Sequence, residues 1–309
     1  MTGRSRVRVW TTGVVALMVL AAASCAPAAT NPDGSVPQNG PASGHGMIQD
    51  GTEVLQADLF AGQILRFNPD TGVISERYSM NEGLCRPDDL ALLPGGDLVA
   101  TCPTQGLVIR VHRGGTATVL ANVGSGVNPI VVDPSGTSVL VGFTYGSDDR
   151  LLRIPLDGSP VQVVASGLPA LAGFGFGPDG KLYVPTGGLN GSLGAGGVGR
   201  IDISTGVLTQ LPLSFPFEPG KSGFDFASGV DVSSDGTIFV AQAFNAAAYA
   251  VNPTTGVATL VGTSSAGIAD NILALTDGRV LLSGFVGGSV TVFTPSGPGY
   301  STSVLAVGI

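Results

Sequence analysis

The sequence predicts an all-β fold, a six-bladed β-propeller of four-stranded antiparallel blades. The first observation is a Gly-containing turn that recurs six times, at Gly51, Gly96, Gly136, Gly180, Gly236 and Gly278, with spacings of 45, 40, 44, 56 and 42 residues. About twenty residues after each one comes a second turn, such as Asn68-Pro69-Asp70-Thr71-Gly72. A four-stranded blade needs roughly 40 to 50 residues, so each repeat corresponds to one blade with two marked turns.

Composition is the second observation. Gly accounts for 48 of the 309 residues and charged residues for 12%, against usual shares of about 7% and 25%. Many turns and much apolar strand surface produce both values. Helical periodicity never runs far without Gly or Pro, so one all-β domain from residue 44 to residue 309 is expected.

Four strands follow in order within each repeat. The inner strands are expected at 90–93, 129–132, 174–176, 230–232 and 272–275, and the second strands at 98–101, 139–143, 182–184, 238–240 and 280–282. The third strands are expected at 107–111, 151–154, 198–203, 248–251 and 290–293, and the fourth at 117–120, 161–164, 207–211, 257–261 and 303–307. Continuous apolar runs such as Ser-Val-Leu-Val-Gly-Phe suit strands that neighbouring blades cover on both faces.

The first blade fits this pattern least well, because its inner strand must come from residues 45–49. Either that strand is short, or residues 301–309 help to close the ring.

The N-terminus is typical of an export signal. Three arginines precede an uncharged run at 9–24, which is shorter than the ~20 residues that span a bilayer. The sequence predicts a signal peptide over 1–24 and a lipidated Cys25, although Ala22 departs from the usual lipobox residue. The alternative is ordinary secretion, with cleavage after Ala23 or Ala28.

Residues 25–43 are expected to be a disordered tether, because they contain four prolines and no aromatic residue. The protein is therefore expected at the outer face of the bacterial cytoplasmic membrane, held by its N-terminal lipid, or secreted. The chain without residues 1–24 has a net charge near −11, which argues against nucleic acid as a partner.

Cys85 and Cys102 flank a predicted hairpin. A disulfide between them is one interpretation in an oxidising compartment. Two buried thiols are the other.

Side chains with oxygen donors open two of the inner strands and precede a third. They are Asp88, Asp89, Asn128, Asp270 and Asn271, and they form a candidate ligand-binding ring, or a shifted Ca²⁺ site, at the mouth of the channel. The alternative is that these residues cap turns through their own backbone. Phe60, Phe143, Tyr145, Phe244 and Phe285 lie near the same loops, where they either line a shallow pocket or pack between blades.

Blade phrases such as Gly177-Pro178-Asp179-Gly180-Lys181-Leu182-Tyr183-Val184 resemble the SMP-30/gluconolactonase family and related NHL-type propellers. The resemblance implies one divalent cation, usually calcium, held by a Glu in blade one, Asn in blades three and four, and Asp in blade five, with hydrolysis of lactones or esters. Asn128 stands where the blade-three Asn is expected. Ala172, Ser228 and a position near His45 stand at the other three.

Other catalytic patterns are weaker. His45 lies at the boundary of the tether and His112 at the end of a third strand, so neither a Ser-His-acid triad nor a zinc site is expected. A lyase like the antibiotic-inactivating propellers would need a channel histidine, and neither His45 nor His112 is expected in the channel.

We therefore expect a binding or scaffolding role, with an unidentified small molecule or protein at the channel rim. The alternative is a divalent-metal-dependent hydrolase of lactones or esters. The loss of most family ligands favours the first.

Overall fold

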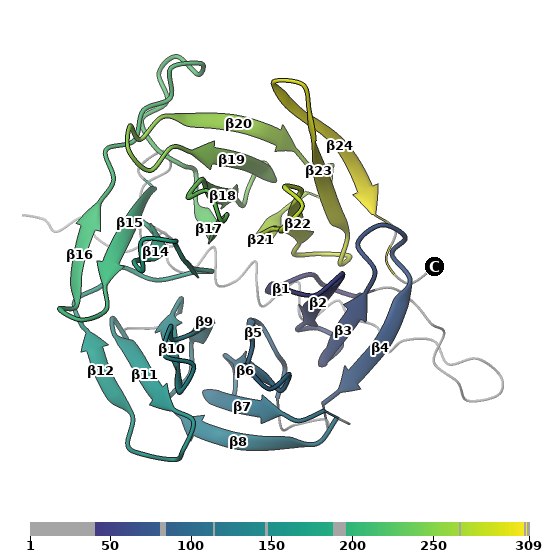
Figure 1. Ribbon diagram of the computed structural model, residues 1–309, viewed down its shortest axis with the longest axis vertical. Helices are drawn as coiled ribbons and strands as arrows, with labels where there is room; N and C mark the ends of the chain where they lie inside the picture. Colours follow the sequence, from purple (N-terminus) through teal and green to yellow (C-terminus); the bar gives the residue numbers. More distant parts are fainter. Residues whose placement is uncertain are drawn as a thin grey trace, which may run out of the picture. The chain divides into compact units, whose positions relative to one another are not determined.

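The computed structural model describes residues 41–80, 85–113, 115–145, 148–187, 196–265, 267–305 and 307. They form six four-stranded antiparallel sheets arranged as blades around a central axis (Figure 1). Each sheet contains four consecutive strands with the innermost first, so the predicted six-bladed propeller is confirmed. The described part of the chain has no helix long and apolar enough to cross a membrane. The predicted signal peptide, Cys25 and the tether up to residue 40 lie outside the described residues.

The inner and second strands lie close to where the turns predict them. The inner strands are β1 (Met47–Asp50), β5 (Leu90–Leu92), β9 (Val127–Val132), β13 (Gly175–Phe176), β17 (Ala227–Val232) and β21 (Ala269–Ala274). The second strands are β2 (Glu53–Asp58), β6 (Leu98–Cys102), β10 (Ser138–Phe143), β14 (Leu182–Thr186), β18 (Ile238–Gln242) and β22 (Val280–Gly284). Every residue of β6, β10, β14, β18 and β22 is buried, as expected for strands covered on both faces.

The third and fourth strands complete each blade toward the outside of the ring. The third strands are β3 (Gln63–Phe67), β7 (Leu107–Val111), β11 (Leu151–Pro155), β15 (Gly197–Asp202), β19 (Ala247–Val251) and β23 (Val290–Ser296). The fourth strands are β4 (Ile74–Ser79), β8 (Ala117–Asn122), β12 (Gln162–Ala165), β16 (Val207–Gln210), β20 (Ala258–Thr263) and β24 (Gly299–Leu305). The last strand starts earlier than predicted because a tight turn pairs Ser296 with Gly299.

The turns between third and fourth strands show why their sequence recurs. Asn252 Oδ1 accepts hydrogen bonds from the backbone N–H groups of Thr254 and Thr255, each at 2.9 Å. Gly256 follows with a φ of +70°, and a Cβ there would lie 1.7 Å from the carbonyl oxygen of Pro212. Only Gly fits this position.

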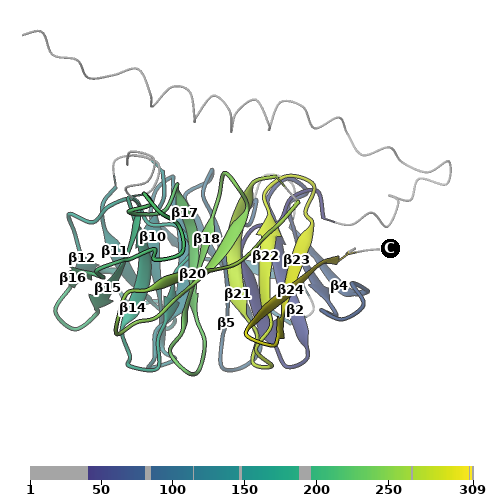
Figure 2. The ribbon, with the colours of Figure 1, turned by 90° about the horizontal axis from the view of Figure 1, so that it is seen from above.

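Two rims follow from this topology, and Figure 2 shows the blades from the side. Turns from first to second and from third to fourth strands lie at one rim, called the turn rim here. Connections from second to third strands, and from one blade to the next, lie at the other, called the loop rim. Residues just before an inner strand therefore lie at the loop rim.

Blade one resolves the question of ring closure. Its inner strand β1 is short, and β24 pairs with β23 within blade six rather than with blade one. The described strands thus contain no sheet that combines the two ends of the chain. Residues 41–43, which the sequence assigns to the end of the tether, lie against the propeller: Pro41 and Ser43 are buried, and Ala42 is exposed.

Cys85 and Cys102 are joined by a disulfide, with their Cα atoms 5.2 Å apart. The bond connects the segment before β5 to the end of β6. The neighbouring Asp88 donates its N–H to the carbonyl oxygen of Thr101 at 2.9 Å, so the disulfide and this hydrogen bond hold the same stretch of chain.

Candidate functional site

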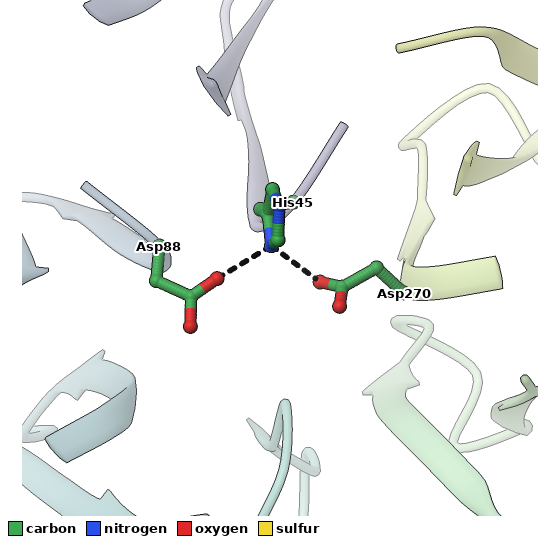
Figure 3. A group of neighbouring side chains, drawn as sticks. All are labelled: His45, Asp88 and Asp270. Carbon is green, nitrogen blue, oxygen red and sulfur yellow. Dashed lines mark ion pairs between the residues drawn. The ribbon is translucent and has the colours of Figure 1, made fainter. Parts of the chain in front are cut away.

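Three titratable side chains from different blades meet at the loop rim. His45 precedes β1, Asp88 precedes β5, and Asp270 lies in β21 (Figure 3). His45 Nδ1 is 2.5 Å from Asp88 Oδ1 and 3.4 Å from Asp270 Oδ2. We call these three residues the mouth cluster.

The local backbone explains how each member reaches the cluster. His45 donates its N–H to the carbonyl oxygen of Ala57 at 3.1 Å, which fixes it to blade one. Asp88 is held by its hydrogen bond to Thr101. Asp270 lies in an irregularity of the β21–β22 register between Ala269 and Ile272. Irregularities of this kind redirect a side chain. Here the carboxylate of Asp270 is directed toward His45.

Burial makes the electrostatics of the mouth cluster unusual. The side chains of His45 and Asp88 are 2% and 3% exposed, and that of Asp270 is 23% exposed. Burial alone would lower the pKa of His45, but the charges of Asp270 and Asp88 outweigh it and raise that pKa well above its ordinary value. Burial raises the pKa of Asp270, and His45 partly offsets the effect. Both carboxylates thus interact with the same imidazole, in a site that is largely shielded from solvent.

His45 is also incompletely hydrogen-bonded. Its Nδ1 contact with the carboxylates lacks hydrogen-bond geometry, and Nε2 is buried with no hydrogen-bond partner among the described residues. An orphaned buried polar group carries a free-energy cost and calls for an explanation. A ligand or ion bound to the imidazole would supply one.

The spacing suits a metal ion. One ligand atom from each of the three residues lies within 4.8 Å of the others. Metal bonds to nitrogen and oxygen are about 2.0 to 2.2 Å, so two atoms bound to one ion are separated by up to about twice that length. Side-chain rotations would be needed to bring all three atoms to bonding distance of one ion, because the 4.8 Å limit is longer than that and the 2.5 Å Nδ1–Oδ1 contact is short.

Aromatic side chains surround the imidazole. Phe285 and Phe60 make edge contacts with the His45 ring, at centroid distances of 5.1 and 6.1 Å. Burial raises the pKa of Tyr145 well above its ordinary value, and the charges of Asp88 and Asp270 add to the shift, so its hydroxyl lies in the field of the cluster. The two other predicted aromatics lie elsewhere, since Phe143 is buried in the core and Phe244 packs on Phe226.

Asp89 and Asn271 follow Asp88 and Asp270 in the sequence but face a different environment. Asp89 accepts hydrogen bonds from the N–H groups of Leu90 and Ile130, at 2.9 and 3.1 Å. Burial raises the pKa of Asp89 to about 8, although these two bonds work against the shift. Asn271 accepts the N–H of Ile272 at 2.8 Å. Both side chains therefore bond to the N–H of the next residue of an inner strand, and Asp89 also bonds to the backbone of blade three.

Below this level the channel contains a cavity of about 520 Å³. Residues from all six inner strands line it, and they include Asp89, Asp231 and Asn271 but no member of the mouth cluster. Asp89 and Asn271 press against glycines on other blades: a Cβ on Gly46 would lie 1.9 Å from Asp89 Oδ1, and one on Gly173 or Gly229 would lie 2.6 Å from Asn271 Oδ1. Four of the five predicted ligand residues are thus divided between two levels of the channel, with Asp88 and Asp270 at the mouth and Asp89 and Asn271 below it.

Asn128 lies in β9, where the resemblance places a metal ligand. Its carbonyl oxygen accepts the Thr101 hydroxyl at 2.6 Å. This contact uses the backbone of Asn128 and connects blade three to blade two. The three-residue mouth cluster does not include it.

Neither histidine is expected in the channel from the sequence, and for His45 this expectation is wrong. The structure places its side chain beside Asp88 and Asp270 at the loop rim. The residue was missed because it stands outside the repeat, before the first complete strand. Its one local signal is the pair of flanking glycines, Gly44 and Gly46, neither of which has space for a Cβ. His112 lies on the outer part of blade two, where it contacts Asp97 at 3.0 Å.

Comparison with known proteins agrees with the fold. No protein-family model matches the sequence, and no curated protein matches it. Among solved structures, the chain is similar to virginiamycin B lyase from Staphylococcus aureus, with 18% identity, a TM-score of 0.61, and coverage of 85% of this chain and 84% of that one.

Two further neighbours come from the propellers that the sequence resembles. A gluconolactonase from Xanthomonas campestris has 16% identity and a TM-score of 0.64, covering 83% of this chain and 88% of that chain. Regucalcin from Agrobacterium tumefaciens, a calcium-binding protein, has 13% identity and a TM-score of 0.59, covering 80% and 83%. The predicted resemblance to these six-bladed propellers is confirmed at the level of fold.

Proposed function

We propose that this propeller binds a divalent cation at His45, Asp88 and Asp270 and uses it to bind and open a lactone or ester at the loop rim. The observation that carries the proposal is a buried histidine, without a hydrogen-bond partner, that lies between two carboxylates from other blades. This arrangement has the donor atoms and the charge that a cation requires.

The donor set favours some cations over others. One imidazole nitrogen with two carboxylates suits Zn²⁺, Mn²⁺ or Fe²⁺. Ca²⁺ prefers six to eight oxygen ligands, and the mouth cluster supplies only two carboxylates. The metal implied by the proposed site therefore differs from the calcium that the family resemblance implies.

When bound, such a cation supplies Lewis acidity toward a carbonyl oxygen or a water molecule. The residues of the chain contribute the rest. Asp88 and Asp270 would hold the cation together with His45, while Phe60 and Phe285 pack against the imidazole and limit the access of water to it. The ordinary pKa of a tyrosine, about 10, already keeps Tyr145 protonated at neutral pH, and burial raises that pKa further. Its hydroxyl is therefore available as a hydrogen-bond donor for an oxygen that gains charge.

Enzymes with this fold support a catalytic role. The neighbours include a gluconolactonase and a virginiamycin B lyase, and a catalytically inactive variant of the lyase has alanine in place of a histidine. The sequence alone suggests no channel histidine for a lyase of this kind, but the buried side chain of His45 lies at the mouth of the channel. The second candidate is ligand binding without turnover, which Ala172 and Ser228 favour because they replace two ligands of the resembled family.

We extend the proposal to location. The predicted signal peptide and lipidated Cys25 place the propeller outside the cytoplasm, and residues 26–40 would separate it from the lipid. The disulfide between Cys85 and Cys102 supports this location, since such bonds persist in oxidising compartments.

Cation binding and turnover test the proposal together. The metal-depleted protein is titrated with ZnCl₂ and MnCl₂ by calorimetry and then assayed against a panel of lactones and esters. We expect one cation per chain and cation-dependent hydrolysis, both lost in His45→Ala and Asp270→Asn. His112→Ala, which changes the histidine outside the channel, serves as the matched control. Stoichiometric binding without turnover of any panel compound would favour the second candidate, and absence of binding would refute the site.

A further inference from the structure

The ring has an unusual junction between blades six and one. Because each described sheet consists of four consecutive strands, no strand from one end of the chain completes a sheet at the other end. Blade six must instead be held to blade one by side chains and by the segment that precedes β1. We call that segment, residues 41–46, the strap.

The strap bonds to three blades in sequence. In blade six, Gly44 donates its N–H to the carbonyl oxygen of Gly284 at 2.9 Å, and Gly287 donates to that of Ala42 at 3.0 Å. In blade two, the carbonyl oxygen of Asp88 accepts the N–H of Gly46 at 2.8 Å. The strap therefore crosses the junction, contacts blade two and then enters blade one at β1.

Blade one anchors the strap through Asp58, which is fully buried. Its carboxylate accepts the N–H groups of Ala42 and Ser43, at 2.9 and 3.1 Å, and the hydroxyl of Ser43 at 2.9 Å. Hydrogen bonds to a charged acceptor are stronger than those between neutral groups. The start of the strap is fixed by this carboxylate.

The middle of the strap fits too closely for larger residues. A Cβ on Gly44 would lie 2.4 Å from Gln56 Nε2, and one on Gly46 would lie 1.9 Å from Asp89 Oδ1. His45, between them, is the side chain that reaches the channel. The position of the strap therefore determines the position of the His45 imidazole.

The remaining polar contacts across the junction lie near the surface. Gln49 bonds to Thr276 through side-chain and backbone groups near the surface, at 3.0 and 2.9 Å. Arg279 pairs with Asp70 at 2.6 Å, with a largely exposed carboxylate, and exposed ion pairs contribute little. Beneath these contacts a buried apolar cluster spans the junction, and it contains residues of blade one (Met47, Val54, Phe67) and of blade six (Leu273, Leu275, Leu281, Val290, Val292). The strap therefore adds polar contacts to a junction that apolar packing already holds.

We propose that the cation of the mouth cluster also serves as a structural clasp that locks the strap and closes the ring. The proposal rests on the metal site proposed above and adds a second role to it. His45 belongs to the strap, Asp270 to blade six and Asp88 to blade two, so one ion joins the groups on both sides of the junction. An ion bound by all three ties the strap down, because release of the strap removes the imidazole from the ion.

Hydrogen exchange tests the clasp in the unmodified protein. The reporters are the amides of Gly44 and Gly287, which bond across the junction, and that of Gly46, which bonds the strap to blade two. The reference is the amide of Val230, which bonds to Gly173 between blades four and five at 2.8 Å. Exchange is measured in chelator and in saturating ZnCl₂ or MnCl₂. We expect the reporters to slow by about tenfold or more on saturation, while the reference changes less, because binding suppresses openings that release the ion.

The outcomes separate the clasp from the proposed function. If calorimetry shows binding but the reporter amides exchange at the same rate as before, the clasp is refuted and the catalytic site stands. If neither cation binds, both fail. Slower exchange of the reporters that disappears in Asp270→Asn but persists in His112→Ala supports the clasp, and equal slowing of Val230 would reduce it to general stabilisation and overturn it.

Discussion

The aspartates of the two rims differ in their surroundings, and their pKa values are shifted in opposite directions. At the turn rim, Asp235 accepts the N–H of Thr237 at 3.0 Å and the hydroxyl of Ser233 at 2.6 Å, and Asp277 accepts the N–H of Arg279 at 3.0 Å. Hydrogen bonds from Ser233 and Arg279, respectively, lower the pKa values of these two acids. At the loop rim, burial raises the pKa of Asp270.

The difference teaches how to separate structural from functional acids in this fold. A turn-rim aspartate is satisfied by residues within its own turn, so the chain needs it for local backbone geometry. The mouth cluster draws its members from three blades, and the ring nitrogens of His45 have no hydrogen-bond partner among the described residues. Local turns explain the first group, and the cation proposed above would explain the second.

The largest expected effect is a loss of cation affinity when an acid of the mouth cluster, rather than an acid of the turn rim, is replaced by its amide. Asp88→Asn and Asp270→Asn should each weaken cation binding at least about a hundredfold, because a charged ligand is lost from a buried site. Asp277→Asn should leave the affinity unchanged. Titration calorimetry checks all three, and similar losses in Asp270→Asn and Asp277→Asn would show that the rims do not differ as described.

Glycines at the two rims give the next largest effect. Gly46→Ala should destabilise the fold by about 3 kcal/mol, at the upper end of overpacking costs, since the new Cβ would lie 1.9 Å from Asp89 Oδ1. Gly51→Ala has open space at the turn rim and a φ of +62°, so only backbone strain of about 1 kcal/mol is expected. Urea unfolding measures both, and equal costs would contradict the fit of the strap.

The disulfide offers a change confined to the approach to the loop rim. The two cysteines are separated by 17 residues, and opening a loop of this length should cost about 2 to 3 kcal/mol. Cation affinity should fall as well, because Asp88 follows Cys85 closely. Unfolding and titration with and without reductant test this, with the Cys85→Ser, Cys102→Ser double variant as the control that reductant must not affect.

The smallest effect is a pH dependence of opposite sign for two acids. Burial raises the pKa of Asp231 to about 6, above the unfolded value of about 3.9, so the native state holds this proton more tightly. Stability should fall as pH rises from about 4 to 6, by on the order of 2 kcal/mol, and Asp231→Asn should remove the slope. For Asp235, with a lowered pKa, the contribution is instead lost as pH falls below about 4. Urea unfolding across pH 3 to 7 checks both signs.

Local chemistry made most of the fold predictable. Gly236 and Gly278 have positive φ values in turns between first and second strands, and Asn252 caps its own corner. Each of these signals is contained within a few residues. A repeat of such signals defines the blades and their order.

The site was only partly predictable because its members are distant in sequence. Asp88 and Asp270 were identified from their positions before inner strands, yet Asp89 and Asn271 could not be separated from them without the register of each strand. His45 depends on a strap that crosses three blades. No periodicity in the sequence describes that path.

The strap also gives the ring a mechanical polarity. If Cys25 carries the proposed lipid, any drag on the propeller reaches it through the chain that enters at Pro41. Tension would then peel the strap from blade six and blade two, and would break the hydrogen bonds of Gly44 and Gly46 before any sheet was sheared. An ion bound to His45 would raise the force needed to detach the strap. The residue that binds the proposed cation would then also determine how well the ring resists tension.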